Sequence, residues 1–357
     1  MNTRLRMEFL EALASQFIRC KRILVSNSAM ARAMRAVKDR NSFDKIHVHE
    51  EMLADSVRMS AYRAAIQRYV NSQDHVVDIG TGTGVLAFLA AAKNPRKLYA
   101  LDHSKKMIKY AKAVAEVNGI ANVTFVASSS YKFRPAEPID VLIQEQMGYA
   151  LFEEGMLEVI LDVRDRCLKP GGRILPAKFE FYLEPVQLLE QERIPLIQEQ
   201  RLYGLTFPRA RPGPNSGYHF RHIDPEHVAF MLCDPEPVFT FDLTTLTLDQ
   251  IPKRFCVSKP IIRTGQVDGI CMYFRAIFDD DISLSTGPEA AKTHWWMILY
   301  RTPARIYRAG EIFGMQVEVP ELSEHRGWSW QIDMQKSAGP CDETDFVGHT
   351  QQRASTL

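Results

Sequence analysis

The fold of this chain is decided by Val76-Val77-Asp78-Ile79-Gly80-Thr81-Gly82-Thr83-Gly84-Val85-Leu86, an apolar run that ends in three alternating glycines. β-Branched residues favour a strand, and glycines at every second position let the backbone turn tightly and approach a ligand closely. A dinucleotide fingerprint has its third glycine three positions after the second, where this chain has Val85. The stretch therefore favours a nucleoside-bearing cofactor other than NAD, with a ligand-free strand-to-helix turn as the alternative.

The glycine spacing, with Asp78 two residues before Gly80, resembles the first motif of the S-adenosyl-methionine-dependent methyltransferases. That resemblance implies that the loop binds S-adenosyl-methionine through Asp78, Gly80, Gly82 and Gly84. Residues 97–101 predict a second strand that ends at Asp102, 22 residues after Gly80, where a Rossmann-like fold accepts hydrogen bonds from a ribose. An alternative role for this side chain is to cap a helix over residues 104–118.

Two more apolar segments, residues 123–126 and 139–143, predict a third and a fourth strand, and helical patterns separate the strands. Such alternation is typical of an α/β fold with a doubly wound parallel sheet. Ligands of such sheets bind at the carboxyl ends of the strands. We therefore expect the residues that follow the strands to converge there, and these are Gly80, Asp102, Ser130 and Glu145.

The chain has 357 residues, which is long for one compact core, so two domains are expected. Hydrophobic residues make up 46% and charged residues 24%, as in soluble globular proteins. The net charge of +1 gives no whole-protein field that would favour direct binding to nucleic acid. No apolar run approaches the roughly 20 residues that cross a bilayer. We expect a cytoplasmic protein, with the nucleus as a second location and no membrane contact.

Residues 1–40 predict an N-terminal helical segment, because apolar residues recur four apart at Leu5, Phe9, Leu13 and Phe17. This helix is expected to dock on the body of the protein. A mitochondrial presequence is the alternative, and acidic residues in the segment argue against it. The six cysteines are scattered without a Cys-x-x-Cys pair, so we expect mostly buried, reduced thiols and no metal site.

A second resemblance comes from the segment 144–156, in which Glu145 and Glu154 stand nine residues apart around Met147-Gly148-Tyr149. This pattern is similar to the double-glutamate loop of the protein arginine N-methyltransferases. Thr293-His294-Trp295 resembles the threonine-histidine-tryptophan loop of that family, and residues 311–314 resemble a strand that follows it. The three motifs occur in the family's order, and the resemblance covers residues 43 to 335.

The family resemblance implies two domains and a dimer. Residues 41–176 would form the Rossmann-like cofactor-binding domain, and residues 177–335, which are rich in short β segments, would form a β-barrel substrate domain. A dimerisation arm would span residues 201–237 and support a homodimer, with a mobile surface loop as the alternative. Residues 336–357 predict a polar tail.

The resemblance also assigns roles at the site. Glu145 and Glu154 would hold the substrate guanidinium by charge-assisted hydrogen bonds, while Asp55 and His294 would help to dispose of the released proton. Arg58 would pair with the methionyl carboxylate of the cofactor, and Ser130 would stand near the adenine. The expected substrate pocket includes Met52, Met147 and Trp295, and Glu145 is also expected to contact the cofactor.

Two departures from the family pattern are visible. Asp102 stands where several members have glutamate, and Phe43 stands where a substrate-contacting tyrosine is common. Met52 and His294 imply the type I product, asymmetric dimethylarginine, formed after monomethylarginine on arginine-glycine-rich segments or histone tails. A type III enzyme that stops at monomethylarginine remains an alternative. So do a same-fold methyltransferase acting on a small molecule or RNA, and a catalytically silent partner subunit.

Overall fold

The computed structural model describes residues 45–197, 201–207 and 219–332. The predicted N-terminal helical segment, Phe43 and the predicted polar tail lie outside these ranges. The chain divides into two compact units, residues 1–49 and residues 50–357. The Rossmann-like and β-rich parts therefore belong to one unit, and everything below concerns that unit apart from the first residues of α3 (Ile46–Ala54), which belong to the other.

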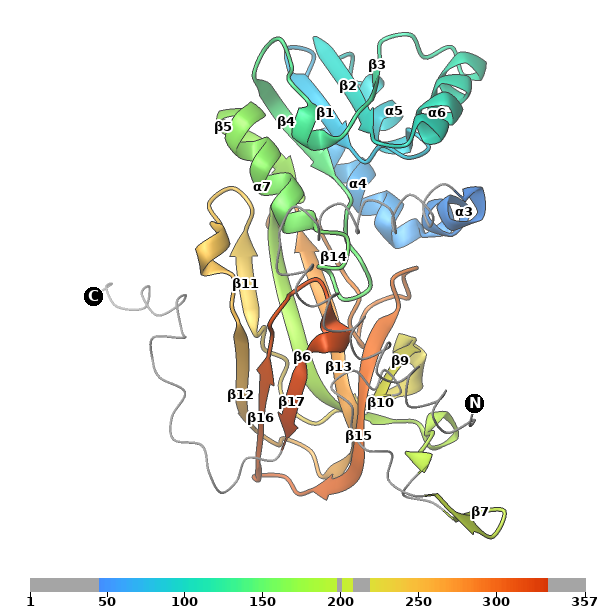
Figure 1. Cartoon of the computed structure of the whole chain (residues 1–357), viewed down its shortest axis with the longest axis vertical. Helices are drawn as coiled ribbons and strands as arrows, with labels where there is room; N and C mark the ends of the chain where they lie inside the picture. Colours follow the sequence, from blue (N-terminus) through green and yellow to red (C-terminus); the bar gives the residue numbers. More distant parts are fainter. Residues whose placement is uncertain (1–44, 198–200, 208–218, 333–357) are drawn as a thin grey trace, which may run out of the picture. The chain divides into compact units, whose positions relative to one another are not determined.

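A parallel five-stranded sheet forms the first half of this unit, with the strand order β3-β2-β1-β4-β5 (Figure 1). All four neighbouring pairs are parallel, which confirms the predicted doubly wound α/β fold. The order reverses between β1 and β4, so the crevice at their carboxyl ends is the expected ligand site. The strands are β1 (His75–Ile79), β2 (Lys97–Asp102), β3 (Thr124–Ala127), β4 (Ile139–Gln144) and β5 (Leu168–Leu175).

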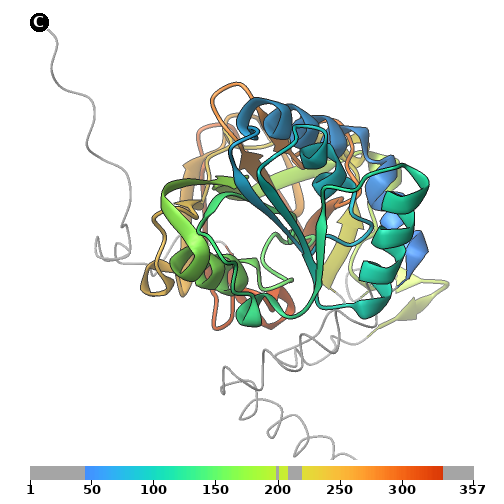
Figure 2. The ribbon, with the colours of Figure 1, turned by 90° about the horizontal axis from the view of Figure 1, so that it is seen from above.

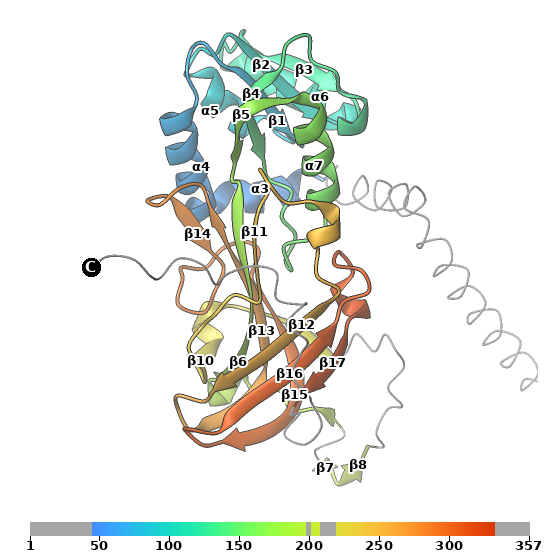
Figure 3. The same ribbon diagram turned by 90° about the vertical axis from the view of Figure 1, so that its left-hand side faces the viewer.

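Helices cover both faces of this sheet, as Figures 2 and 3 show for α4 and α5 on one face and α7 on the other. Asp55 separates α3 from α4 by capping α4, because its side chain accepts a hydrogen bond from the Arg58 amide. Ser104 caps α6 in the same way through Met107 N. The helices are α3 (Ile46–Ala54), α4 (Ser56–Tyr69), α5 (Val85–Ala91), α6 (Lys105–Val117) and α7 (Met156–Cys167).

The second half of the unit is antiparallel, as the β-barrel prediction requires. A seven-stranded sheet has the order β10-β6-β13-β15-β9, with β11 paired to β6 and β14 paired to β13, and β12-β16-β17 form a second sheet. The strands are β6 (Lys178–Leu188), β9 (Phe220–Ile223), β10 (Val228–Met231), β11 (Phe239–Asp242), β12 (Arg254–Pro260), β13 (Gly265–Ile277), β14 (Ser283–Ser285), β15 (Met297–Tyr307), β16 (Ile312–Glu318) and β17 (Ser329–Ile332).

The range predicted as an arm, residues 201–237, is divided between two kinds of structure. Its described beginning is a hairpin of β7 (Arg201–Leu202) and β8 (Leu205–Thr206). Its later part belongs to the seven-stranded sheet, since β9 pairs with β15 and β10 pairs with β6. These strands were not expected, because short polar and aromatic segments carry little periodicity.

The core runs through both halves of the unit as one cluster that includes Tyr62, Ile79, Phe152, Phe181 and Trp295. Cys167, Cys233 and Cys271 are buried and free, as predicted, whereas Cys256 is disulfide-bonded and corrects the expectation of reduced thiols. Within the described ranges, no helix has both the length and the apolar character needed to cross a membrane.

Candidate functional site

The glycine loop leaves β1 with backbone angles that suit glycine. Gly80, Gly82 and Gly84 all have positive φ values, of 72°, 53° and 89°. A Cβ atom on Gly84 would lie 2.5 Å from the ring of Phe88 on α5, so this glycine also leaves room for that ring. The Gly80 amide donates to the Leu101 carbonyl at 2.9 Å, which fixes the turn against the end of β2.

Asp78 is 1% exposed and supports the loop from within. Its Oδ2 accepts hydrogen bonds from Thr81 Oγ1 at 2.6 Å and from Ala87 N at 3.2 Å. Burial raises the pKa of Asp78 to about 7, although these two hydrogen bonds act in the opposite direction. These two hydrogen bonds of Asp78 thus stabilise the conformation of the loop, and its predicted contact with the cofactor stays a prediction.

Asp102 lies at the end of β2 and holds the same loop from the other side. Its Oδ2 accepts from Gly82 N at 3.0 Å, and its Oδ1 accepts from Ser104 N at 2.8 Å. The segment before Ser130 runs beside it, because Ser128 N donates to the Asp102 carbonyl at 2.9 Å. Gly82 and Asp102 are therefore in direct contact at the end of β2, and the segment before Ser130 lies beside them, while the predicted convergence of Gly80, Asp102, Ser130 and Glu145 on the cofactor stays a prediction.

Asp55 joins the start of α4 to the loop before β15. Its Oδ1 accepts from Arg58 N at 2.9 Å, while its Oδ2 accepts from His294 N at 2.9 Å and lies 2.8 Å from His294 Nδ1. Burial alone would raise the pKa of Asp55, but the hydrogen bonds from His294 and Arg58 bring it below its ordinary value. Asp55 is therefore ionised at neutral pH.

Arg58 is 5% exposed and forms an ion pair with Glu145. Its Nη2 donates to Glu145 Oε2 at 2.6 Å, and its Nη1 donates to the Met52 carbonyl at 3.1 Å. Burial acts to lower the pKa of Arg58, but the charge and hydrogen bond of Glu145, together with Tyr62 and Asp55, outweigh it and raise that pKa above the ordinary value. The Arg58 guanidinium thus contacts two other predicted site residues, Glu145 and Met52.

The loop between Glu145 and Glu154 is tied to the β-rich half by Trp295. This side chain is 2% exposed, and its Nε1 donates to the Met147 carbonyl at 2.6 Å. Glu154 is half-buried. Burial raises the pKa of Tyr149, and the charges of Glu153, Glu51 and, least of the three, Glu154 add to this effect. Negative charge therefore gathers around Tyr149.

Sequence analysis missed three residues that hold the site. Tyr62 is fully buried and donates its hydroxyl to the Gln144 carbonyl at 2.7 Å, which ties α4 to β4. Gln146 lies over the glycine loop, with atoms 3.7 Å from an ideal Cβ on Gly80. Glu153 contacts His325 of the β-rich half. Only the tyrosine, polar on an apolar helix face, gave a signal in the sequence.

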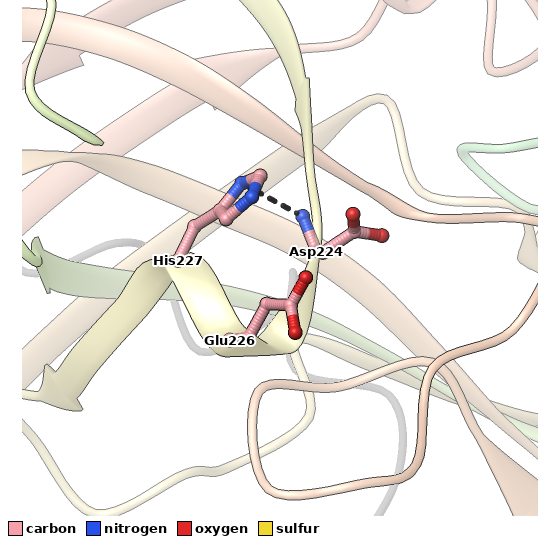
Figure 4. A group of neighbouring side chains, drawn as sticks. All are labelled: Asp224, Glu226 and His227. Carbon is pink, nitrogen blue, oxygen red and sulfur yellow. Dashed lines mark hydrogen bonds between the residues drawn. The ribbon is translucent and has the colours of Figure 1, made fainter. Parts of the chain in front are cut away.

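Among the described residues, one group could offer ligands to a metal ion, and it consists of Asp224, Glu226 and His227 (Figure 4). The group caps a short 3-10 helix, since His227 Nδ1 accepts from Asp224 N at 3.2 Å. Asp224 Oδ2 also accepts from Lys292 Nζ at 2.8 Å. Because the Lys292 ammonium already contacts an oxygen that a metal ion would need, a cation is disfavoured at this group. The expectation that the protein has no metal site stays a prediction.

The sequence matches two family models. Residues 70–205 match a methyltransferase domain, and residues 216–345 match an arginine methyltransferase oligomerization subdomain. The protein arginine N-methyltransferase 6 of Danio rerio is 30% identical over 266 residues, which cover 71% of this chain and 76% of that protein. The protein arginine N-methyltransferase 1 of Dictyostelium discoideum is 29% identical over 261 residues, with the same coverage of 71% and 76%.

Solved structures resemble this fold as well. The PRMT1 enzyme-prozyme heterotetrameric complex with AdoHcy from Trypanosoma brucei has a TM-score of 0.65 at 25% identity, covering 78% of this chain and 89% of that one. The protein arginine methyltransferase 10 of Arabidopsis thaliana has a TM-score of 0.64 at 23% identity, covering 80% and 91%. The second likeness concerns the fold alone.

The buried Asp78 predicts a pH dependence of stability. Its pKa is about 7 in the folded protein against an ordinary 3.8, so between these values the folded state holds a proton that the unfolded chain has released. This contribution is present below pH 3.8 and is lost as the pH rises through about 7. Asp78→Asn keeps the acceptor oxygen, so the free energy of unfolding, measured with urea, should fall less steeply over this range. The exposed Asp280→Asn serves as the control and should keep the slope of the unmodified protein; an unchanged slope in Asp78→Asn would contradict the assignment.

Proposed function

Since the chain belongs to the protein arginine N-methyltransferase family, we propose that it transfers methyl groups from S-adenosyl-methionine to guanidinium nitrogens of protein arginines. The observation that carries this proposal is the double contact of Asp55. This carboxylate holds His294 on one side and the start of the helix with Arg58 on the other. Arg58 at the start of α4 and His294 in the β-rich half are thereby held close together.

The residues present fit a zwitterionic cofactor group. Two buried polar atoms of this region, Arg58 Nε and Gln146 Oε1, have no hydrogen-bond partner. Arg58 Nε would donate to a carboxylate, and Gln146 Oε1 would accept from an ammonium. Asp102 would take the ribose hydroxyls, and Ser130 would lie toward the adenine. When bound, S-adenosyl-methionine supplies a methyl group on a positively charged sulfur.

The substrate guanidinium needs carboxylates, because it is planar, delocalised and protonated at physiological pH. Glu145 uses Oε2 in its ion pair with Arg58, and a carboxylate has a second oxygen that can accept from the substrate. Glu154 would accept from the other side and fix the guanidinium plane. The Asp55–His294 pair would then take up the proton that the nitrogen releases.

Neither of the two alternative functions, a methyltransferase for other substrates or a silent partner subunit, explains these contacts as well. A methyltransferase acting on a small molecule or RNA would not need two carboxylates directed at one cation. A silent partner subunit would not need the Asp55–His294 pair. Arginine-containing proteins, among them arginine-glycine-rich segments and histone tails, are the proposed substrates, and the cytoplasm and the nucleus are the proposed locations.

Glu145 and Glu154, which would hold the substrate guanidinium between them, are called the guanidinium clamp below. Removing the charge of Glu154 should slow the reaction strongly. Glu154→Gln loses a charge-assisted hydrogen bond at the reacting group, which commonly costs about 100-fold to 1,000-fold in rate. Transfer from labelled S-adenosyl-methionine to an arginine-glycine-rich peptide should fall by that factor, while calorimetry shows nearly unchanged cofactor affinity. The control is Glu116→Gln on the exposed face of α6. Near-normal turnover of Glu154→Gln would refute the guanidinium clamp.

The proposed final product is asymmetric dimethylarginine. Met52 is half-buried beside Arg58, and a flexible thioether side chain can adapt to a nitrogen that already carries one methyl group. Amino-acid analysis after prolonged turnover should show asymmetric dimethylarginine, and Met52→Phe should shift the product toward monomethylarginine. Leu53→Phe, at an exposed neighbouring position, is the control. Monomethylarginine alone from the unmodified protein would favour a type III enzyme.

We also propose a homodimer that uses the hairpin of β7 and β8. Tyr203 and Leu205 on this hairpin are 101% and 62% exposed, and large apolar side chains in such a position favour coverage by a second copy. The double variant Tyr203→Ser/Leu205→Ser should halve the mass measured by light scattering. The control is Ile306→Ser, which replaces another exposed apolar residue. A variant that keeps the mass of a dimer would remove the hairpin from the interface.

A further inference from the structure

Two adjacent glutamates, Glu153 and Glu154, end the loop that follows β4. The family resemblance assigns Glu154 to the substrate guanidinium and gives Glu153 no role. In the structure, Glu153 has a set of contacts that bind it to the loop itself and to the β-rich half of the unit. We propose that Glu153 and His325 form a positioning pair that holds the double-glutamate loop in the geometry needed for methyl transfer. The proposal rests on the function proposed above.

The first contacts of Glu153 are within its own loop. Gly148 and Leu151 exchange two backbone hydrogen bonds, of 3.2 Å and 2.9 Å, and form a tight reversal in which Leu151 has a φ of 66°. Glu153 Oε2 accepts from Ala150 N, at the tip of this reversal, at 2.9 Å. A positive φ is costly for a leucine, so the reversal needs external support.

Gly148 shows how closely Glu153 folds back on the loop. An ideal Cβ on Gly148 would lie 2.6 Å from Glu153 Oε2 and 2.7 Å from Glu153 Cβ. Glycine is therefore needed here for a close approach rather than for its backbone angles, since its φ is not positive. The Glu153 side chain occupies the space that any other residue at 148 would need.

The second oxygen of Glu153 reaches the β-rich half. His325 Nδ1 lies 2.9 Å from Glu153 Oε1, and His325 is only 6% exposed. His325 stands on the 3-10 helix His325–Gly327 between β16 and β17, and its ring meets Phe220 of β9 edge to face at 5.0 Å. A ring held by a neighbouring aromatic side chain gives the carboxylate a fixed donor.

The β-rich half therefore supplies donors to the loop at two places, from Trp295 to the Met147 carbonyl and from His325 to Glu153. Glu154 is the next residue after Glu153. A shift of the Glu153 backbone would move Glu154 with it, and a displacement of about 1 Å at a reacting group can cost roughly 100-fold in rate. Glu153 and His325 thus act on catalysis through Glu154 and need not touch the substrate.

The test uses two replacements of His325 in the full chain. His325→Phe keeps the ring contact with Phe220 but removes the donor to Glu153, whereas His325→Asn keeps an N–H donor. We expect His325→Phe to lower kcat on an arginine-glycine-rich peptide by about 10-fold to 100-fold, with KM for both substrates within about twofold. His325→Asn should recover most of kcat. A purely structural role would not distinguish the two variants in kcat at equal thermal stability.

A second measurement does not depend on activity. In His325→Phe, hydrogen exchange should become faster at the amides of residues 148–153, while residues 76–86 of the glycine loop exchange as in the unmodified protein. Glu153→Leu, which removes the other partner, should produce the same pattern of exchange. The double variant should exchange little faster at these amides than either single variant. If either variant does not fold, the other tests the pair alone.

The outcomes separate this inference from the proposed function. Unchanged exchange at residues 148–153 in a folded His325→Phe or Glu153→Leu variant overturns the positioning pair, as does a kcat within about twofold of the unmodified value. An unmodified protein that methylates no arginine peptide overturns the proposed function, and the exchange measurement then still decides whether the pair holds the loop.

Discussion

The site depends on one buried carboxylate, that of Asp55. Its Oδ1 starts α4 by capping the Arg58 amide, and its Oδ2 holds both the backbone and the ring of His294. A buried charge is tolerated only when its oxygens are satisfied, and here three donors satisfy them. The same carboxylate therefore fixes the backbone at Arg58 and the position of the His294 ring, although these residues belong to different halves of the unit.

A second consequence concerns the loop after β4. Its start is held by Tyr62 at the Gln144 carbonyl, its middle by Trp295 at the Met147 carbonyl and its end by His325 at Glu153. One of these donors comes from α4 and two come from the β-rich half. Neither half can complete the site alone, which explains why the two halves share a continuous core instead of a mobile linker.

Local features of the fold were predictable, and long-range pairings were not. The strand before Gly80, the helix α6 and the acidic residue at the end of β2 follow from neighbouring residues and were found from the sequence, although Ser104 caps this helix and not Asp102, which was the alternative role considered for that residue. The Arg58–Glu145 pair joins residues 87 positions apart, and the Asp55–His294 contact spans 239 positions. Only the family resemblance pointed to the residues of these pairs, because periodicity carries no information on such distances. The resemblance singled out Glu154, but nothing in the sequence indicated that Glu153 contacts His325.

The arrangement also explains how several carboxylates can stand close together before any substrate arrives. Like charges in one site repel, and one of them would take up a proton if nothing opposed it. Here Glu145 faces Arg58, Asp55 faces His294 and Glu153 faces His325, so each of the three has a donor of its own. These partners keep the acids in place. A cationic acceptor then meets carboxylates that are already oriented, and the cost of ordering them has been met during folding rather than during binding.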